Sequence, residues 1–131
     1  MSKPVQKIII TTNDEKSTEI NAVFDSGSFY TIIRQDRIPR GAAVLERLNT
    51  QTFRTAGQGG KLNITGDISL TFTIGDKMIH DSAFVSPDLV SDMLLGAKTM
   101  QAWDISITNN KGKTEIIIGH DMRDPEITEV D

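Results

Sequence analysis

The chain contains no cysteine, so disulfide bonds and thiolate chemistry are excluded. It has only two histidines, His80 and His120, which lie far apart without cysteine or paired histidine neighbours, so we expect no metal site. No stretch approaches the roughly 20 apolar residues that a membrane-spanning helix needs. The apolar run near the N-terminus is too short for a signal peptide, and we therefore expect a cytoplasmic protein.

Positive charge is outnumbered, because 14 Lys and Arg residues face 18 Asp and Glu residues and the net charge is −4. This balance argues against a nucleic-acid partner. Five acids against one arginine lie between Asp121 and Asp131, whereas the centre is basic, with arginines at positions 34, 37, 40, 47 and 54. We interpret these arginines as solvated surface; docking of the acidic tail onto the body is the alternative. The length predicts one domain, residues 1–120, followed by a tail, residues 121–131, that tends to disorder.

Strand patterns dominate the sequence. Alternation of apolar and polar residues, which is typical of half-buried strands, is clearest between Gly60 and Asp76. The Gly-Asp pairs at 66–67 and 75–76 predict a bend or bulge and a turn. Further strands are predicted at 7–12, 18–24 and 78–85, a hairpin at 104–119, and short helices at Gly41–Leu48 and Gly96–Trp103. Many short strands indicate an all-β sandwich or barrel.

The stretch "VFDSGSFYTII", residues 23–33, interrupts an apolar pattern with Asp25-Ser26-Gly27-Ser28. A buried carboxylate is costly unless it is hydrogen-bonded. The glycine permits close backbone approach, and the two hydroxyls can donate to the carboxylate or brace the loop. A serine-rich turn would explain the tetrapeptide alone. Turns lie in polar surroundings, however, and this loop is flanked by apolar residues on both sides, so we interpret it as a functional site.

Two later stretches complete the pattern. The first, "TAGQGGKLNITG" at residues 55–66, is rich in glycine and could be interpreted as a phosphate-binding loop. Such a loop precedes a helix, whereas an alternating strand follows here, so we disfavour phosphate binding. "DMLLGAKTM" places Leu94, Leu95 and Gly96 directly before the predicted helix. In their order and spacing the three motifs resemble those of the retropepsins, the single-lobe aspartic proteases of the retroviral type. The resemblance covers roughly Lys7 to Ile107.

The resemblance implies a fold and an assembly. The fold is an all-β closed acid-protease barrel with a flap hairpin and one short helix near the C-terminal part. Aspartic proteolysis needs two carboxylates that share a proton, one activating water and the other donating to the carbonyl oxygen. Because the chain carries one Asp-Ser-Gly box, a two-fold homodimer would supply the second Asp25. The implied function is a homodimeric aspartic endopeptidase with a peptide substrate, an acidic optimum, no cofactor, and no nucleic-acid or membrane partner.

The resemblance also implies residue roles. Beside Asp25, Ser26 would brace the two catalytic loops across the two-fold axis, Gly27 would admit the substrate backbone, and Ser28 would donate to an outer carboxylate oxygen. The flap tip would offer backbone N–H groups to the substrate and exclude water. The flap residues are Ala56, Gly57, Gln58, Gly59 and Gly60; Ile32 and Leu94 would line apolar subsites, with Leu95 and Gly96 in the second signature.

The sequence departs from the viral pattern at two positions. Viral members commonly have an acid after the box and an arginine after the second glycine, where this chain has Phe29 and Ala97. Both partners are missing together, so no buried charge is left unpaired. The alternative function is a catalytically inactive retropepsin-fold module for dimerisation or peptide binding. The intact Asp-Ser-Gly box favours the protease.

Overall fold

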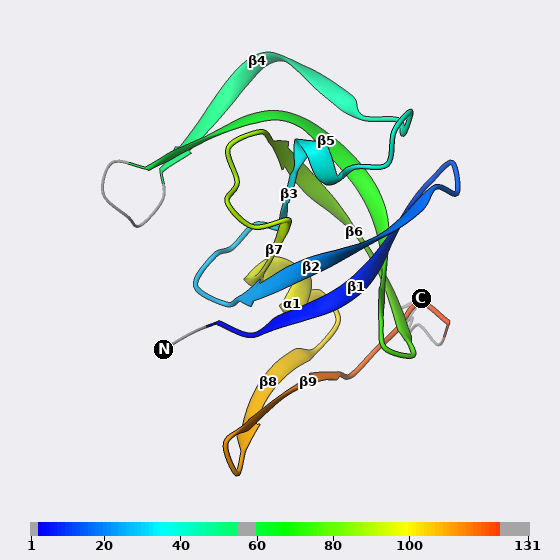
Figure 1. Ribbon diagram of the computed structural model, residues 1–131, viewed down its shortest axis with the longest axis vertical. Coiled ribbons are helices and arrows are strands. Elements are labelled where there is room, and N and C mark those ends of the chain that lie inside the picture. The colour runs from blue at the N-terminus through cyan, green and yellow to red at the C-terminus, as the bar shows by residue number, and fades with distance from the viewer. Residues whose placement is uncertain (1–2, 55–59, 124–131) are drawn as a thin grey trace, which may run out of the picture.

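The computed structural model describes residues 3–54 and 60–123, which form an all-β body with one short α-helix (Figure 1). The elements in chain order are β1 (Val5–Thr12), β2 (Ser17–Asp25), β3 (Ile32–Arg34), the 3-10 helix η1 (Gln35–Arg37), β4 (Leu45–Arg54), β5 (Lys61–Ile74), β6 (Lys77–Ser86), β7 (Met93–Gly96), α1 (Ala97–Ala102), β8 (Ile105–Asn110) and β9 (Lys113–Ile118). Within the described residues, no helix is long and apolar enough to cross a membrane.

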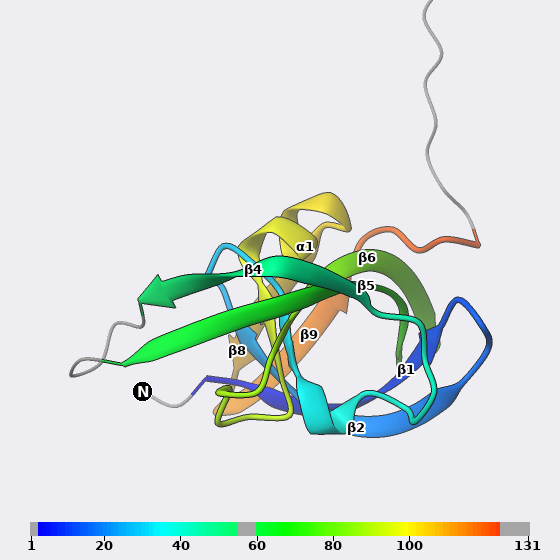
Figure 2. The same ribbon diagram turned by 90° about the horizontal axis from the view of Figure 1, so that it is seen from above.

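Six strands close into a barrel. The main sheet has the order β1-β2-β7-β3-β6-β5-β4, and additional pairing between β1 and β5 closes the ring. β4 lies outside the ring, along β5 (Figure 2). Because β5 pairs with β6 only from Gly66 onward, the strand segments 51–54 and 61–64 form an arm of two strands beyond the ring.

The barrel core follows the alternation of the strands. In β5, side chains from Ile64 to Ile74 alternate between buried and partly buried, and Phe72 is fully enclosed. Ile8 and Ile10 of β1 and Phe24 of β2 belong to the same core cluster as Phe72. Burial of this apolar surface stabilises the barrel and places the end of β2 at a fixed position.

Two expectations for the centre of the chain need correction. The helix predicted over Gly41–Leu48 is wrong: residues from Leu45 onward form β4, and the side chain of Leu48 is fully exposed. The apolar pattern there was too short to specify a helix against hydrogen bonding to β5. The irregularity expected in β5 at Gly66 lies in β4 instead, between Glu46 and Gln51. A Cβ at Gly66 would lie 2.9 Å from Val44 Cγ1, so glycine lets the two strands approach.

The predicted turn after β5, the helix after Gly96 and the C-terminal hairpin agree with expectation. Gly75 and Asp76 form the two-residue turn between β5 and β6, with Gly75 at φ +60°. α1 and the β8–β9 hairpin are present, and the hairpin is a separate sheet that projects from the barrel (Figure 1). Met122 N–H donates to Met78 O over 2.7 Å, so ordered contacts of the chain continue past residue 120.

Candidate active site

Asp25 ends β2 and pairs in parallel with Gly96 at the end of β7. It is 9% exposed. The backbone of the following turn holds it, because Gly27 N–H donates to Asp25 Oδ1 over 3.0 Å and Ser28 N–H donates to Asp25 O over 3.1 Å. An amide donor aimed at one carboxylate oxygen fixes the side chain and leaves the other oxygen for further partners.

Gly96 allows β7 and α1 to pack directly on the loop that follows Asp25. A Cβ at this position would overlap the Tyr30 carbonyl group and lie 2.7 Å from Phe29 O. Ala97 N–H donates to Ser28 O over 2.6 Å, and Lys98 N–H donates to Phe29 O over 2.9 Å. Viral members commonly carry an ion pair at the positions of Phe29 and Ala97. In this chain, backbone hydrogen bonds join the loop to the helix at these positions.

A cleft of about 1020 Å³ opens above this loop. Asp25, Gly27 and Ser28 lie in it beside apolar walls, and cationic side chains lie at its edge. Mostly apolar walls with a few placed polar groups are typical of ligand sites. The lining residues are Lys3, Asp25, Gly27, Ser28, Phe29, Tyr30, Ile32, Thr52, Phe53, Arg54, Leu62 and Leu94.

Five of the predicted site residues line one cleft, namely Asp25, Gly27, Ser28, Ile32 and Leu94. Ile32 and Leu94 line the same cleft as Asp25, whereas Leu95 is fully buried in the barrel core. Ser26 is exposed and lines a separate hollow between the loop, α1 and β8. Gly60 is partly buried just before β5. The remaining predicted flap residues lie outside the described residues: Ala56, Gly57, Gln58 and Gly59.

The contact expected for Ser28 is not the one observed. Its hydroxyl donates to Tyr30 O over 3.2 Å and not to the Asp25 carboxylate. The cause is local, because a serine hydroxyl in a turn competes for nearby backbone carbonyls. The second carboxylate oxygen of Asp25 is instead bonded by Lys3 Nζ over 2.7 Å.

A sequence profile of the retroviral aspartyl protease family matches residues 1–108. The chain belongs to this family. Structure comparison gives the retroviral protease-like domain of Ddi1 from Leishmania major at 18% identity and TM-score 0.63, covering 90% of this chain and 92% of that chain. The EIAV protease complexed with the inhibitor HBY-793 matches at 18% identity and TM-score 0.52, covering 77% and 88%. A comparison with curated protein sequences gives no match.

The two structural matches confirm the expected retropepsin-like fold. At 18% identity they carry the fold alone. Sequence reasoning missed several features of this barrel, among them an aromatic group of which two residues line the cleft and a polar network behind the loop that follows Asp25.

The aromatic group consists of Tyr30, Phe53 and Phe84. The ring centroids lie 5.4 Å apart for Tyr30 and Phe53 and 5.0 Å apart for Tyr30 and Phe84. Arg47 lies over Phe84 at 4.9 Å and binds the Asp67 carboxylate, whose hydrogen bonds raise the pKa of Arg47. These aromatic residues come from three separate segments, so no local pattern signals their contact.

The polar network begins at Thr31, which lies between the loop that follows Asp25 and β3. Its hydroxyl accepts a hydrogen bond from Gly96 N–H at 3.0 Å and lies 2.6 Å from the Thr99 hydroxyl. Thr99 Oγ1 also lies 2.7 Å from Asp81 Oδ2. The signal in the sequence was Thr31 itself, a buried hydroxyl inside the apolar run.

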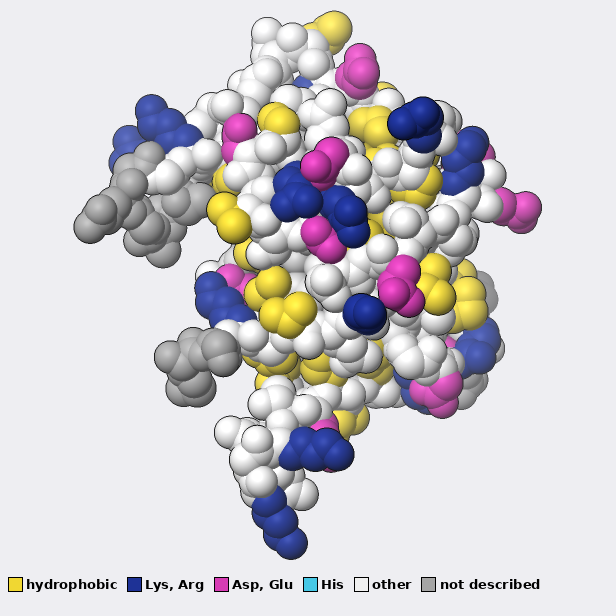
Figure 3. All heavy atoms as spheres, viewed as in Figure 1, with side chains coloured by type: hydrophobic (Ala, Val, Ile, Leu, Met, Phe, Trp, Pro, Cys, Tyr) yellow, Lys and Arg dark blue, Asp and Glu magenta, His cyan; other side chains and the backbone are white. Residues whose placement is uncertain are grey.

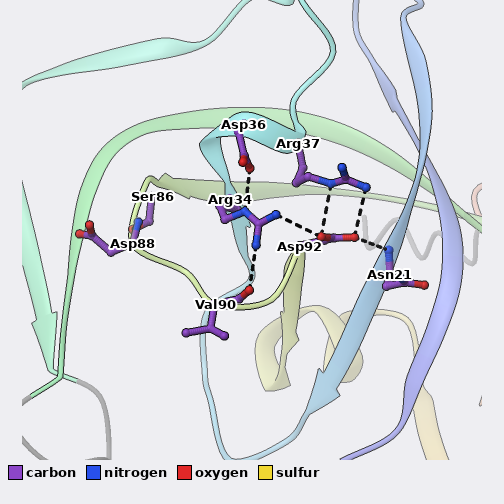
Figure 4. Close-up of polar contacts among 8 residues, drawn as sticks. All are labelled: Asn21, Arg34, Asp36, Arg37, Ser86, Asp88, Val90 and Asp92. Carbon is purple, nitrogen blue, oxygen red and sulfur yellow. Dashed lines mark hydrogen bonds and ion pairs between the residues drawn. The ribbon is translucent and has the colours of Figure 1, made fainter.

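Asp92 anchors the strand that carries the second signature (Figure 4). It immediately precedes β7 and accepts hydrogen bonds from Asn21 N–H, Arg34 and Arg37 at 3.0, 3.4 and 3.4 Å. Arg34 also donates to Val90 O over 2.8 Å. One carboxylate thus ties β2, β3 and η1 to the start of β7, which sets the parallel register between Asp25 and Gly96.

The described residues offer no cluster for a metal. Among residues 3–54 and 60–123, no group of three or more His, Asp or Glu side chains could hold a metal ion. His80 Nδ1 lies 3.3 Å from the Thr71 hydroxyl, and His120 Nε2 lies beside Asp104. Both histidines therefore have contacts of their own.

Proposed function

We propose that the chain is a homodimeric aspartic endopeptidase that cleaves peptide bonds with water activated between two Asp25 carboxylates, one from each subunit. The single observation that carries the proposal is the position of Asp25, held by the Gly27 amide in a large, mostly apolar cleft. Membership in the retroviral aspartyl protease family supports the same chemistry.

The chemistry requires two carboxylates in different protonation states. The ionised Asp25 takes a proton from water, and the hydroxide oxygen forms a bond to the scissile carbonyl carbon. The protonated Asp25 of the other subunit gives its proton to the carbonyl oxygen. The resulting gem-diol collapses when its C–N bond breaks: the first Asp25 gives the proton it took from water to the leaving nitrogen, and the second Asp25, now ionised, takes a proton from a gem-diol hydroxyl. One Asp25 cannot fill both roles, so a single subunit carries half of this site.

The exposed position of Ser26 supports a two-fold assembly. Ser26 lies on the outer side of the catalytic loop, beside a hollow of about 530 Å³ that Met100 and Ile105 also line. For two Asp25 side chains to meet, the two-fold axis has to pass close to this loop. Ser26 is then placed to contact its counterpart.

The second candidate is a peptide-binding or dimerisation module without turnover. The ion pair between Lys3 and Asp25 favours it, because the ammonium occupies a carboxylate oxygen that proteolysis needs.

A peptide-library digest separates the two candidates. We expect cleavage by the unaltered protein, inhibition by a transition-state isostere of aspartic proteases, and no cleavage by Asp25→Asn, which removes the charge and keeps the size. Circular dichroism and sedimentation should show that the variant keeps its fold and dimer. Specific activity should fall on dilution through the dimer dissociation constant. Wild-type turnover by Asp25→Asn, or constant specific activity from a monomer, contradicts the proposal.

A further inference from the structure

We infer that the cleft selects peptides with an acidic side chain close to the scissile bond, and that Arg54 binds that side chain. The inference rests on the proposed function, because it names the class of substrate for the same cleft. It begins from an unfavourable pair of like charges in the arm formed by β4 and β5.

Arg54 and Lys61 are direct register partners at the ends of β4 and β5. Both side chains are exposed, and neither forms an ion pair or hydrogen bond within residues 3–54 and 60–123. Like charges directly opposite each other in an antiparallel pair destabilise it. An anion bound at this position would remove the repulsion.

Arg54 lines the same cleft as Asp25. Lys3, the other cation of the lining, bonds to Asp25 itself. Figure 3 shows Lys and Arg side chains on both sides of the hollow at the left edge of the molecule, with hydrophobic side chains between them. A peptide in the cleft therefore passes between positive charges.

The other charged side chains among the described lining residues are already paired. Asp25 is the one carboxylate among the described lining residues, and it pairs with Lys3. Arg47, which lies over Phe84 nearby, is bound to Asp67 at 3.0 Å. Arg54 is thus the lining cation left to accept a carboxylate from substrate. A basic side chain at the same position would be repelled, which gives the cleft selectivity as well as attraction.

The test compares peptides that differ at one position. A cleaved library peptide is prepared with Glu, Gln or Lys at each position within three residues of the scissile bond, and kcat/KM is measured. We expect the order Glu, Gln, Lys at one position, with a Glu-to-Gln ratio of up to about fivefold, the range of an exposed ion pair. The ratio should fall as NaCl is raised, because salt screens exposed charges.

Variants then assign the preference to Arg54. Arg54→Gln should abolish the Glu-to-Gln ratio, Arg54→Lys should retain most of it, and Arg54→Glu should invert the order toward the Lys peptide. Arg40→Glu is the matched control, because Arg40 is an exposed arginine outside the cleft and the change in net charge is the same. Circular dichroism confirms that each variant is folded.

The outcomes separate the inference from the proposed function. Equal kcat/KM for Glu and Gln peptides at every position, or a ratio that survives Arg54→Gln, overturns the inference and leaves the protease standing. If the unaltered protein cleaves no peptide, the proposed function fails. The inference is then tested by binding: fluorescence anisotropy measures the affinity of the unaltered protein for labelled Glu and Gln peptides. Tighter binding of the Glu peptide that Arg54→Gln removes supports it. Equal binding, or no binding of either peptide, overturns it.

Discussion

Lys3 Nζ lies 2.7 Å from Asp25 Oδ2, on the carboxylate oxygen that the Gly27 amide does not bond. The Asp25 side chain is 11% exposed, whereas that of Lys3 is 59% exposed. Ion pairs with one solvated partner contribute little to stability. The Lys3 ammonium therefore covers the Asp25 carboxylate within the single chain. A group that bonds to Oδ2 more strongly would displace it.

Lys3→Met should raise kcat/KM on a peptide without charged side chains by up to about fivefold. This factor corresponds to the free energy of an exposed ion pair. The reason is that water can then reach Asp25 Oδ2 without displacing an ammonium. Lys7→Met is the matched control, because Lys7 pairs with Glu19 at 3.8 Å outside the cleft. A fall in kcat/KM for Lys3→Met would show that the ammonium assists the reaction.

Gly96→Ala should lower the free energy of unfolding by about 3 kcal/mol, the upper end of the usual cost of overpacking. The added methyl group would overlap the Tyr30 carbonyl group and separate β7 from the loop that follows Asp25. Urea unfolding measures the loss. Gly112→Ala is the comparison, because Gly112 has φ +77° and a methyl group added there would meet no atom within 4 Å, so only left-handed strain of about 1 kcal/mol is expected. Equal costs would contradict the steric argument.

Asp92→Ala should lower the free energy of unfolding by about 2–3 kcal/mol, because the Asn21 amide and two guanidinium groups lose their acceptor. Asp36→Ala removes a carboxylate from the same Arg34, but the Asp36 side chain is 71% exposed, so a loss of at most about 1 kcal/mol is expected. Chemical denaturation of both variants checks the contrast. A smaller loss for Asp92→Ala than for Asp36→Ala would refute its role as the anchor of β7.

The contact between residues 121–123 and the β5–β6 turn should weaken in acid. Hydrogen bonds from Arg123 hold the pKa of Asp121 below its ordinary value of 3.8, and Met78 N–H adds a further bond. Because the folded-state pKa is lowered, the contribution is present at neutral pH and is lost as the pH falls through that lowered pKa. The ¹H–¹⁵N shift of the Met122 amide, which donates to Met78 O, should report the change. Asp121→Asn should remove this pH dependence, and a transition retained in that variant would exclude Asp121 as its source.

The alternating barrel strands and the loop that follows Asp25 were predictable because their signals are local. The alternation in β5 is repeated over 14 residues, and Asp25 with Gly27 forms a short motif inside an apolar run. The helix after Gly96 was predicted for the same reason. In each case, the residues that determine the structure are neighbours in sequence.

The misses arise where distant segments decide the structure. Among the described residues, β4 pairs with β5 alone, and most of its side chains are exposed. Its sequence therefore carries no clear alternation, and Leu45 and Leu48 suggested a helix. The hydroxyl of Ser28 was assigned from the family pattern, but the nearby Tyr30 carbonyl accepts it. Lys3 lies 22 residues from Asp25 along the chain, and no spacing rule could join them.

The register shift in β4, between Glu46 and Gln51, divides the β4–β5 pair into two segments. On one side, Gly66 and the residues after it belong to the closed ring. On the other side, segments 51–54 and 61–64 have no strand partner but each other among the residues that the structure describes. The arm is nevertheless held to the body by its side chains, because Phe53 stacks on Tyr30 at 5.4 Å and Ile64 packs with Ile32 and Leu89. A change of length near the exposed Leu48 would therefore move Phe53 against the loop that follows Asp25. In this fold, the length of β4 and the surroundings of the Asp25 carboxylate are therefore coupled.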